Sequence, residues 1–483
     1  MLPGFYLPRR GRKPRSAQQM FADKIASLRR KSFKQIGALF GQFIPEQYLN
    51  PELSGVMSRR SIFSKENTFW AFLGQVLDAD GGCKEVIGKI QSYASIKGRT
   101  IPSSSTASYC AARKKLSEQT LADIFQYTAT KGDRTTESGL LMNRRVVVVD
   151  GTGFSMPDTS ANQEAWPQSA TQKPGCGFPS ARVCACFSLE SGSLLGYEVG
   201  NKKNHELPLL RTQRKTFRSG DIFLGGKGFC SFYDIAKFKE QGVDSVVTLA
   251  RRKPVSKSKC LEAFGPNDLL IKWNRPNKYV PQLSYSRETL EQLPEELLFR
   301  QIRVTVNQPG FRTKEFYIIT TLLDPAQYPA QEIADLYLKR WDVELFFRDI
   351  KITMGMDVLR CLTPEMIRKE ILMHFIAYNC VRRLMYEAAE KANLPVRAVS
   401  FKGAVQAVRN WIPQFNRENL SRAERNRLLH DLYDAVTGLP LKQRPGRREP
   451  RCKKRRPKAY QLLTKPRSEM KEIMHRNRYS QHP

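Results

Sequence analysis

Features that would indicate a membrane, secreted or zinc-binding protein are missing from the sequence. No run approaches the roughly 18 consecutive apolar residues of a membrane-spanning helix, and residues 1–15 lack the apolar core of a signal peptide. We therefore expect a cytoplasmic protein that does not enter a membrane. The five histidines are far apart, and the ten cysteines include no Cys-x-x-Cys pair. This spacing disfavours a zinc site and indicates reduced structural thiols.

Acidic residues are scarce relative to basic ones. The 483 residues contain 46 Asp and Glu against 80 Lys and Arg, a formal net charge of +34. Such an excess exceeds what solubility requires and favours a polyanionic partner, with nucleic acid as the leading candidate. A generally basic surface or a ribosome-associated protein is the alternative. The length allows two or three domains.

The two ends of the chain are expected to be basic, and the N-terminal part helical. Residues 1–16 combine Arg and Lys with Gly and Pro, which is typical of a flexible arm. Residues 17–140 contain helix-period stretches at Phe33–Phe43 and Thr68–Leu77 and are interpreted as a helical domain. Residues 396–483 are expected to be helical and basic, ending in a solvated tail.

The middle of the chain, residues 141–395, shows the pattern of an α/β domain. Three strand-like segments come first: Val146–Val149, Arg182–Phe187 and Leu194–Val199. Helix and strand then alternate through His205–Thr216, Asp221–Leu224, Ser231–Gln241 and Ser245–Leu249. This order predicts a mixed sheet with helices packed against it.

Further strand-like runs interrupt this alternation between about residues 251 and 323. The clearest are Ile302–Val306 and Phe316–Leu322, and we interpret the whole region as a β-rich insertion. Its basic start at residues 251–253 suggests contact with DNA. A long helical stretch is expected from about residue 330 to residue 392.

The most informative segment lies within this helical stretch. At roughly 100° per residue, Tyr337, Arg340, Glu344 and Lys351 fall on one narrow polar stripe of a helix. Apolar residues flank the stripe, Leu336, Val343, Phe347 and Ile350 on one side and Leu338, Trp341, Leu345 and Ile352 on the other. Charges held between apolar faces must be paired or bind a metal, so the stripe indicates a site. The alternative is an amphipathic helix whose charges face solvent.

This spacing of Tyr, Arg, Glu and Lys resembles the signature of the transposases of bacterial insertion sequences, family four. Three other segments are similar to motifs of that family and occur in its order: Asp150–Asp158, Gln172–Pro179 and Met354–Arg360. The resemblance extends from about residue 33 to residue 390.

The resemblance implies a ribonuclease-H-like, retroviral-integrase-like core and a DDE active site that cuts and joins DNA with two Mg²⁺ ions. Asp150 and Glu344 would be catalytic metal ligands, because Mg²⁺ requires oxygen donors. Tyr337, Arg340 and Lys351 would hold the phosphates of the DNA end. The family also implies that the helical N-terminal domain binds the terminal inverted repeats. A homodimer would then join two DNA ends and a target DNA.

The sequence departs from the family at the second aspartate. That residue normally follows an apolar strand and precedes Arg-Gly-Phe-Cys-Ser, but here Gly226 occupies the position. Glycine has no side-chain donor, so metal affinity and catalysis should be weakened. Asp221 is on the same strand but about 16 Å away. Asp234 is on the following helix, and neither residue is a convincing replacement.

Three functional hypotheses follow from these observations. The first is an insertion-sequence transposase whose cleavage and strand transfer are impaired by Gly226. The second is a DNA-binding relative that grips the DNA ends without cutting and could inhibit an active transposase. The third is a basic ribonucleoprotein component, although no signature of an RNA-binding module is found in the sequence.

Overall fold

A computed structural model describes most of the chain. The described residues are 37, 39–50, 62–96, 98, 100–133, 141, 143–201, 205–249, 260–276, 285–306, 315–416, 420–438, 440–441 and 462–470. The expected basic arm, the basic start of the insertion and the tail at residues 442–458 lie outside them. The chain forms two compact units, one of residues 1–124 with 406–432 and the other of residues 125–405 with 433–483.

The first unit is helical. It contains the short 3₁₀ segments Gly41–Phe43 and Glu46–Leu49, followed by α3 (Lys65–Leu77), α4 (Cys83–Ile96), α5 (Ala107–Lys115) and the start of α6 (Glu118–Gly132). The helix expected at Thr68–Leu77 is confirmed as part of α3, and α3 is buried from Asn67 onwards. Its Gln75 Oε1 accepts hydrogen bonds from Tyr109 Oη at 2.7 Å and Arg113 Nη1 at 3.3 Å. These bonds satisfy a buried amide and join α3 to α5.

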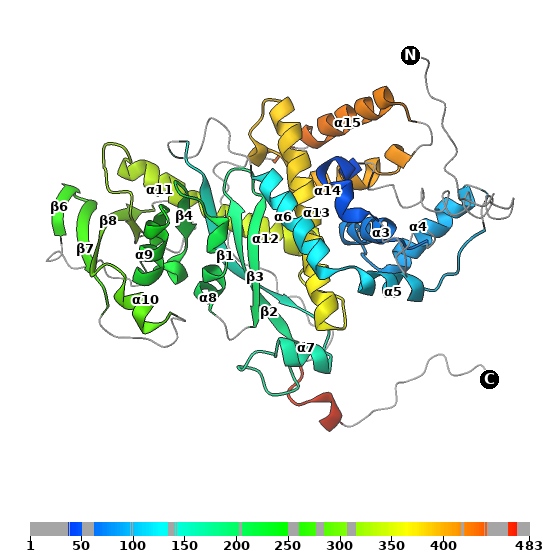
Figure 1. Cartoon of the computed structure of the whole chain (residues 1–483), viewed down its shortest axis with the longest axis horizontal. Coiled ribbons are helices and arrows are strands. Elements are labelled where there is room, and N and C mark those ends of the chain that lie inside the picture. The colour runs from blue at the N-terminus through cyan, green and yellow to red at the C-terminus, as the bar shows by residue number, and fades with distance from the viewer. Residues whose placement is uncertain are drawn as a thin grey trace, which may run out of the picture. The chain divides into compact units, whose positions relative to one another are not determined.

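A nine-stranded mixed sheet organises the second unit, with the strand order β3-β2-β1-β4-β5-β9-β8-β7-β6 (Figure 1). Its first five strands are β1 (Val146–Ser155), β2 (Ser180–Ser188), β3 (Leu194–Asn201), β4 (Ile222–Gly225) and β5 (Asp244–Thr248). The first three form an antiparallel meander, whereas β1, β4 and β5 are mutually parallel. This arrangement confirms the expected α/β fold class with a mixed sheet.

The β-rich insertion continues the same sheet. It contributes β6 (Cys260–Gly265), β7 (Asp268–Asn274), β8 (Glu296–Thr305) and β9 (Glu315–Thr320), all paired antiparallel. Strand β9 also pairs antiparallel with β5, so the insertion adds to one edge of the core. The fully buried Arg300 of β8 forms an ion pair with Asp268 of β7 and donates to the Tyr328 carbonyl at 2.7 Å.

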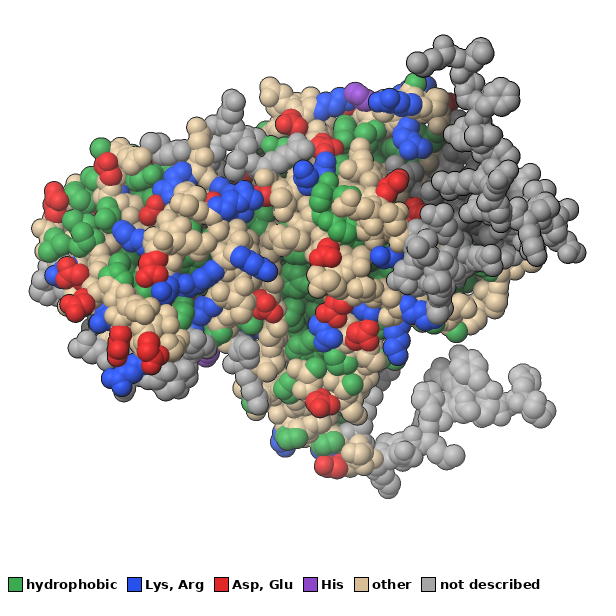
Figure 2. Space-filling view, in the orientation of Figure 1, with side chains coloured by type: hydrophobic (Ala, Val, Ile, Leu, Met, Phe, Trp, Pro, Cys, Tyr) green, Lys and Arg blue, Asp and Glu red, His purple; other side chains and the backbone are tan. Residues whose placement is uncertain are grey.

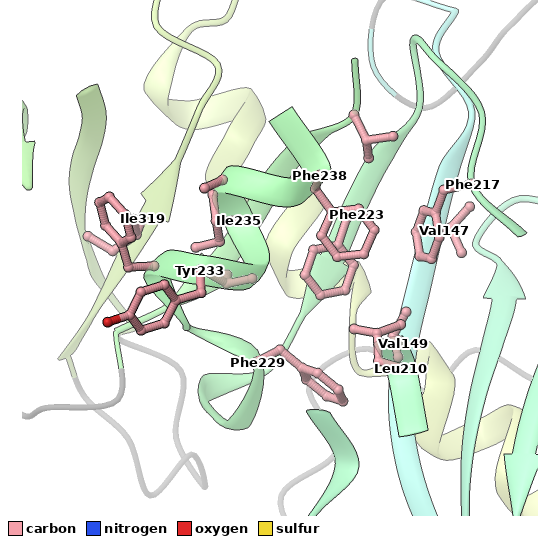
Figure 3. Packing of buried hydrophobic residues seen from close by; sticks show 14 of the residues in the cluster. Val147, Val149, Leu210, Phe217, Phe223, Phe229, Tyr233, Ile235, Phe238 and Ile319 are labelled. Carbon is pink, nitrogen blue, oxygen red and sulfur yellow. The ribbon is translucent and has the colours of Figure 1, made fainter. Parts of the chain in front are cut away.

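Helices cover both faces of this sheet. On one face, α8 (Glu206–Arg211), α9 (Phe232–Glu240) and α10 (Arg287–Glu291) contribute to a large apolar cluster that includes Val147 and Val149 of β1 (Figure 3). Residues alternate between faces along a strand, so Val148 and Asp150 point to the opposite face. There, the ring of Phe187 on β2 contacts Phe346, Phe347 and Tyr378.

The helices on this second face carry the segment expected to hold the site. They are α11 (Ala330–Lys339), α12 (Asp342–Arg348) and α13 (Pro364–Lys391), and α13 is buried along most of its length. The other helices are α7 (Ser160–Ala165), α14 (Phe401–Trp411) and α15 (Arg422–Thr437). Within the described ranges, no helix has the length and apolar content needed to cross a membrane.

Charged side chains of both signs are mixed on the face shown in Figure 2. Lys and Arg are distributed across it with Asp and Glu among them, rather than forming one continuous basic surface. On this face, therefore, the distribution of charge does not by itself locate a DNA-binding surface.

Candidate active site

Asp150 lies where two parallel strands separate. The sequence predicted that the strand ends at Val149 and that Asp150 follows it. Instead, β1 continues to Ser155, because its antiparallel pairing with β2 continues. The parallel pairing with β4 stops at the pair Val149–Gly225. Asp150 is thus the first β1 residue without a β4 partner, and this edge of β1 is open beside it.

Gly226 directly follows β4 at the same level, on the same face as Asp150. Its backbone is extended, with φ −78° and ψ −178°, a conformation available to any residue. A Cβ atom at this position would meet only the Arg340 guanidinium, 3.7 Å from Nη1. The structure therefore has room for the carboxylate that this sequence lacks.

The segment from Tyr337 to Lys351 is not one regular α-helix, in contrast to the geometry assumed from the sequence. After α11, the backbone tightens: Val343 and Glu344 donate to the carbonyls three residues earlier, on Arg340 and Trp341. After α12, it widens into a π-helical turn at Asp349–Thr353. About the helix axis, successive side chains are therefore rotated by more than 100° in the tight turn and by less than 100° in the π-helical turn.

Only one of the two expected apolar faces is buried. Leu336, Val343, Phe347 and Ile350 are at most 7 % exposed, as expected. On the other side, Trp341, Leu345 and Ile352 are 44 %, 42 % and 68 % exposed, which corrects the expectation that the polar stripe lies between two buried faces. The stripe borders the surface and is accessible to a large ligand.

Arg340 connects this segment to β1. Its Nη1 lies 3.4 Å from Oδ2 of Asp150, and its guanidinium lies over the rings of Tyr337 and Trp341, 5.6 and 5.0 Å from their centroids. Its Nε is buried and has no hydrogen-bond partner among the described residues. The guanidinium thus retains hydrogen-bonding capacity for an anion.

Tyr337 and Lys351, which we also expected at the DNA, are both held by the protein. Tyr337 is 5 % exposed, and its hydroxyl shares a 2.6 Å hydrogen bond with Thr248 of β5. Lys351 donates to the Gly153 carbonyl at 2.9 Å and lies 3.2 Å from a carboxylate oxygen of Asp357. Arg340 and Lys351 therefore contact β1 at two different residues, Asp150 and Gly153. The Tyr337 ring packs against the guanidinium of Arg340.

Asp150 and Glu344 line one open cavity of about 440 Å³, together with Lys351. The structure therefore brings the two expected carboxylates to the same cavity. Burial raises the pKa of Asp150, although a hydrogen bond from the Gly151 amide and the Arg340 charge oppose this shift. A carboxylate partly removed from water in this way favours a nearby cation.

The two aspartates weighed as replacements for Gly226 are occupied elsewhere. Asp221 forms an ion pair with Arg145 and accepts from the Arg218 amide at 2.7 Å. Because Ile222 pairs with Val146, Asp221 lies at the opposite end of β4 from Gly226, as its position in the sequence indicated.

Asp234 on α9 is held still more firmly. Arg211 donates twice to it at 2.8 Å, and Arg214 and Tyr285 donate at 3.2 and 2.8 Å. Burial would raise the pKa of Asp234, but the hydrogen bonds and charge of Arg211, with further hydrogen bonds from Ser231 and Tyr285, lower it overall. Asp234 is a structural residue and is not available as a metal ligand.

Sequence reasoning missed Glu206, the first residue of α8. A Cβ atom added to Gly151 would lie 2.3 Å from Glu206 Oε1, so this carboxylate packs against the residue that follows Asp150. Burial raises the pKa of Glu206, and the charge of Asp150 raises it further. The available signal was an acidic residue at the start of a helix that follows a core strand.

The donor set suits Mg²⁺ in kind but is incomplete. Asp150 and Glu344 supply carboxylate oxygens, the ligands that Mg²⁺ prefers. Gly226 supplies none, and the described residues contain no group of three His, Cys, Asp or Glu side chains close enough to hold a metal ion.

Comparison with known proteins defines the class to which this fold and site belong. Residues 142–380 match the family described as the transposase DDE domain, so the chain is a DDE transposase, one of a family of DNA-cleaving and strand-transferring enzymes. Its similarity to the transposases of the IS4 and IS231 elements supports a place among the insertion-sequence transposases of the IS4 family.

The chain is similar to individual transposases of insertion sequences and to one solved structure. The chain is 25% identical over 433 residues to the transposase InsG for insertion sequence element IS4 of Escherichia coli (strain K12), covering 86% of this chain and 93% of that protein. It is 19% identical over 291 residues to the transposase for insertion sequence element IS231C of Bacillus thuringiensis subsp. berliner, covering 53% and 60%. Among solved structures, the piggyBac transposase synaptic complex with hairpin DNA aligns with a TM-score of 0.43 and 11% identity, over 88% of this chain and 86% of that one.

Proposed function

We propose that this transposase binds the terminal inverted repeats of an insertion sequence and that Gly226 impairs its metal-dependent cleavage and strand transfer. One observation carries the proposal. Asp150 and Glu344 line a common cavity, while the position beside Asp150 that faces Arg340 has no carboxylate. The fold of a cutting enzyme is retained, and one part of its metal site is missing.

Asp150 and Glu344 would hold the metal in this account. Bound Mg²⁺ would supply an activated water or 3′-hydroxyl and stabilise the leaving oxygen. Loss of the carboxylate at residue 226 leaves Asp150 with a guanidinium as its nearby cation, at 3.4 Å. We therefore expect cleavage by this chain to be slow rather than its fold to be altered.

Arg340 is the residue best placed to exchange partners when DNA binds. Its 3.4 Å contact with Asp150 is longer than a charge-assisted hydrogen bond of about 2.8 Å. A phosphate oxygen beside Trp341 could accept a hydrogen bond from the guanidinium. Lys351 adds a second positive charge beside β1. The Tyr337 ring packs against the Arg340 guanidinium and helps to hold it in place.

The remaining partners follow from the family. The helical first unit would bind the terminal repeats, and a homodimer would bring together two DNA ends and the target DNA. A DNA substrate implies action in the bacterial cytoplasm, at the nucleoid.

A second function is favoured by Gly226 itself. If the missing carboxylate abolishes cleavage, the chain is a DNA-binding protein that occupies insertion-sequence ends and inhibits an active relative. The basic groups around Asp150 do not depend on residue 226, so binding would survive loss of catalysis.

Two measurements on end-labelled duplexes test these proposals. Fluorescence anisotropy compares binding to the terminal repeat with binding to a shuffled duplex, and the proposal requires a preference for the repeat. Cleavage with Mg²⁺ or Mn²⁺ is then compared for this chain and for Gly226→Asp. Cleavage only after the substitution supports an impaired transposase, whereas selective binding without cleavage by either protein supports the inhibitor.

A further inference from the structure

Helix α12 is held at both of its ends by an aspartate that pairs with an arginine. Asp342, its first residue, forms an ion pair with Arg397 at 2.6 Å. Asp349, which directly follows the helix, accepts a hydrogen bond from Nη2 of Arg382 at 2.8 Å. Because the two aspartates are seven residues apart, they lie on one face of the helix, and Glu344 lies about 200° around the axis from Asp342. The ion pairs therefore hold α12 on the side away from Glu344.

The pair between Arg382 and Asp349 is part of a buried network. The side chains of these two residues are 7 % and 10 % exposed. Nε of Arg382 also donates to the Tyr378 hydroxyl at 2.9 Å, and that hydroxyl donates to the Gly192 carbonyl at 2.7 Å. Gly192 lies in the turn that joins β2 to β3. A chain of hydrogen bonds thus connects the end of the core sheet to Asp349.

Asp349 is the residue at which the π-helical turn Asp349–Thr353 begins. Its carbonyl accepts from the Met354 amide, five residues later, at 3.1 Å. Such wide turns are rare and occur frequently at functional sites. Lys351 lies two residues after Asp349 within this turn, and it donates to β1 at 2.9 Å. The pair with Arg382 therefore fixes the start of the turn that carries Lys351.

Asp349 and Arg382 are separated from the cavity at which DNA is proposed to bind. Lys351 is among the residues that line this cavity, whereas Asp349 and Arg382 are not. Burial raises the pKa of Asp349, although the charges of Arg382 and Arg348 oppose this shift. Removing one partner of a buried ion pair leaves the other charge uncompensated, so the pair strongly resists separation. Any effect of Asp349 on a ligand in the cavity would act through Lys351.

We propose that Asp349 and Arg382 are positioning residues for DNA binding, and that their ion pair holds the π-helical turn so that Lys351 faces the cavity. The proposal rests on the proposed function, because it assumes that Lys351 contacts a phosphate of the DNA end. The role concerns DNA binding alone and involves no metal ion. It gives the irregular helix geometry after Arg348 a purpose, because this geometry sets the direction of the Lys351 side chain.

The salt dependence of DNA binding tests the proposal in a buffer without divalent metal. Fluorescence anisotropy with the terminal-repeat duplex compares the full-length chain with Asp349→Asn, Lys351→Ala and the double variant at several salt concentrations. Asp268→Asn is the matched control, because Asp268 is a buried aspartate of β7 that pairs with the fully buried Arg300 outside the cavity. Thermal unfolding of each variant shows that it is folded.

Lys351→Ala should lower the slope of log affinity against log salt by about one, through loss of one phosphate contact. Asp349→Asn should cause most of the same loss. The double variant should lose no more than Lys351→Ala alone, because both changes remove one contact. Asp268→Asn should lower the unfolding temperature and leave the slope unchanged. An unchanged slope for Asp349→Asn, or losses that add in the double variant, overturns the proposal.

Arg382→Lys provides the same comparison if Asp349→Asn does not fold. It keeps a positive charge but lacks the planar fork that bonds Asp349 and Tyr378 together, so it should also lower the slope. A shuffled duplex separates this proposal from the proposed function. Equal affinity for the repeat and the shuffled duplex overturns recognition of the ends, while the same slope differences on the shuffled duplex still support the positioning of Lys351. Failure of the unaltered chain to bind DNA overturns both.

Discussion

Nη1 of Arg340 lies 3.4 Å from Oδ2 of Asp150, and the same guanidinium faces Gly226, the position at which the sequence resemblance predicts a second aspartate. A protein cation thus lies within the expected metal site. Arg340 is therefore proposed both to bind a DNA phosphate and to adjoin the proposed metal ligand Asp150.

Replacing Arg340 with Ala should weaken binding to insertion-sequence ends and lower the slope of log affinity against log salt by about one. One phosphate contact would be lost. Arg287→Ala is the control, since Arg287 is 77 % exposed and pairs with Glu291 on α10. Anisotropy titrations at several salt concentrations give both quantities, and an unchanged slope for Arg340→Ala would count against phosphate binding by this residue.

Gly151→Ala should lower the free energy of unfolding by about 1 to 3 kcal/mol, because the added methyl group displaces the Glu206 carboxylate. Gly153→Ala provides the matched comparison on the same strand. Its Cβ would be 3.6 Å from the Ala181 carbonyl, an ordinary contact. Urea unfolding measures both variants, and equal losses would show that the close packing of Glu206 against Gly151 does not contribute to stability.

Asp234→Asn should lower the free energy of unfolding by about 3 kcal/mol, because it leaves the partly buried Arg211 and Arg214 charges without their carboxylate. Urea unfolding at neutral pH measures the loss. Mn²⁺ binding should not change, since Asp234 is bound by arginines and not by the metal. A loss of Mn²⁺ binding with unchanged stability would reverse this assignment.

The effect of Asp234 should also depend on pH in one direction. Its pKa is lower in the folded chain than its ordinary value of 3.8, because Arg211, Ser231 and Tyr285 outweigh the effect of burial. The stabilisation is therefore present above about pH 4 and is lost as the pH falls through the folded-state pKa. The stability difference between this chain and Asp234→Asn should shrink on acidification, and a difference that grows instead would contradict the shift.

Much of the fold was predictable from local sequence patterns. Val146–Val149 predicted the start of β1, and the alternating segments predicted β4, α9 and β5 in the correct order. The strand end at Val149 was wrong because pairing with β2 extends β1 through two glycines. A β-branched run identifies where a strand begins, but its neighbours determine how far it continues.

The residues of the candidate site were predictable where a local sequence motif marks them, as at Asp150 and in the segment from Tyr337 to Lys351. Arg340 and Glu344 were found by their spacing, although regular helix geometry did not anticipate the tight turn at Arg340 or the π-helical turn after Arg348. Glu206 escaped notice because its proximity to Asp150 depends on how α8 packs against β1 and on the space at Gly151. Such tertiary proximity has no local pattern in the sequence.

Single-turnover cleavage of labelled end DNA with Mn²⁺ shows whether the site lacks one carboxylate. The chain is compared with Gly226→Asp, the neutral isostere Gly226→Asn, and Gly226→Asp combined with Glu344→Ala. Gly226→Asp is expected to cleave about 10-fold to 100-fold faster than the unaltered chain. Gly226→Asn should gain little, and Glu344→Ala should remove the gain. Equal cleavage rates for Gly226→Asp and the unaltered chain, with DNA binding intact, would contradict this expectation.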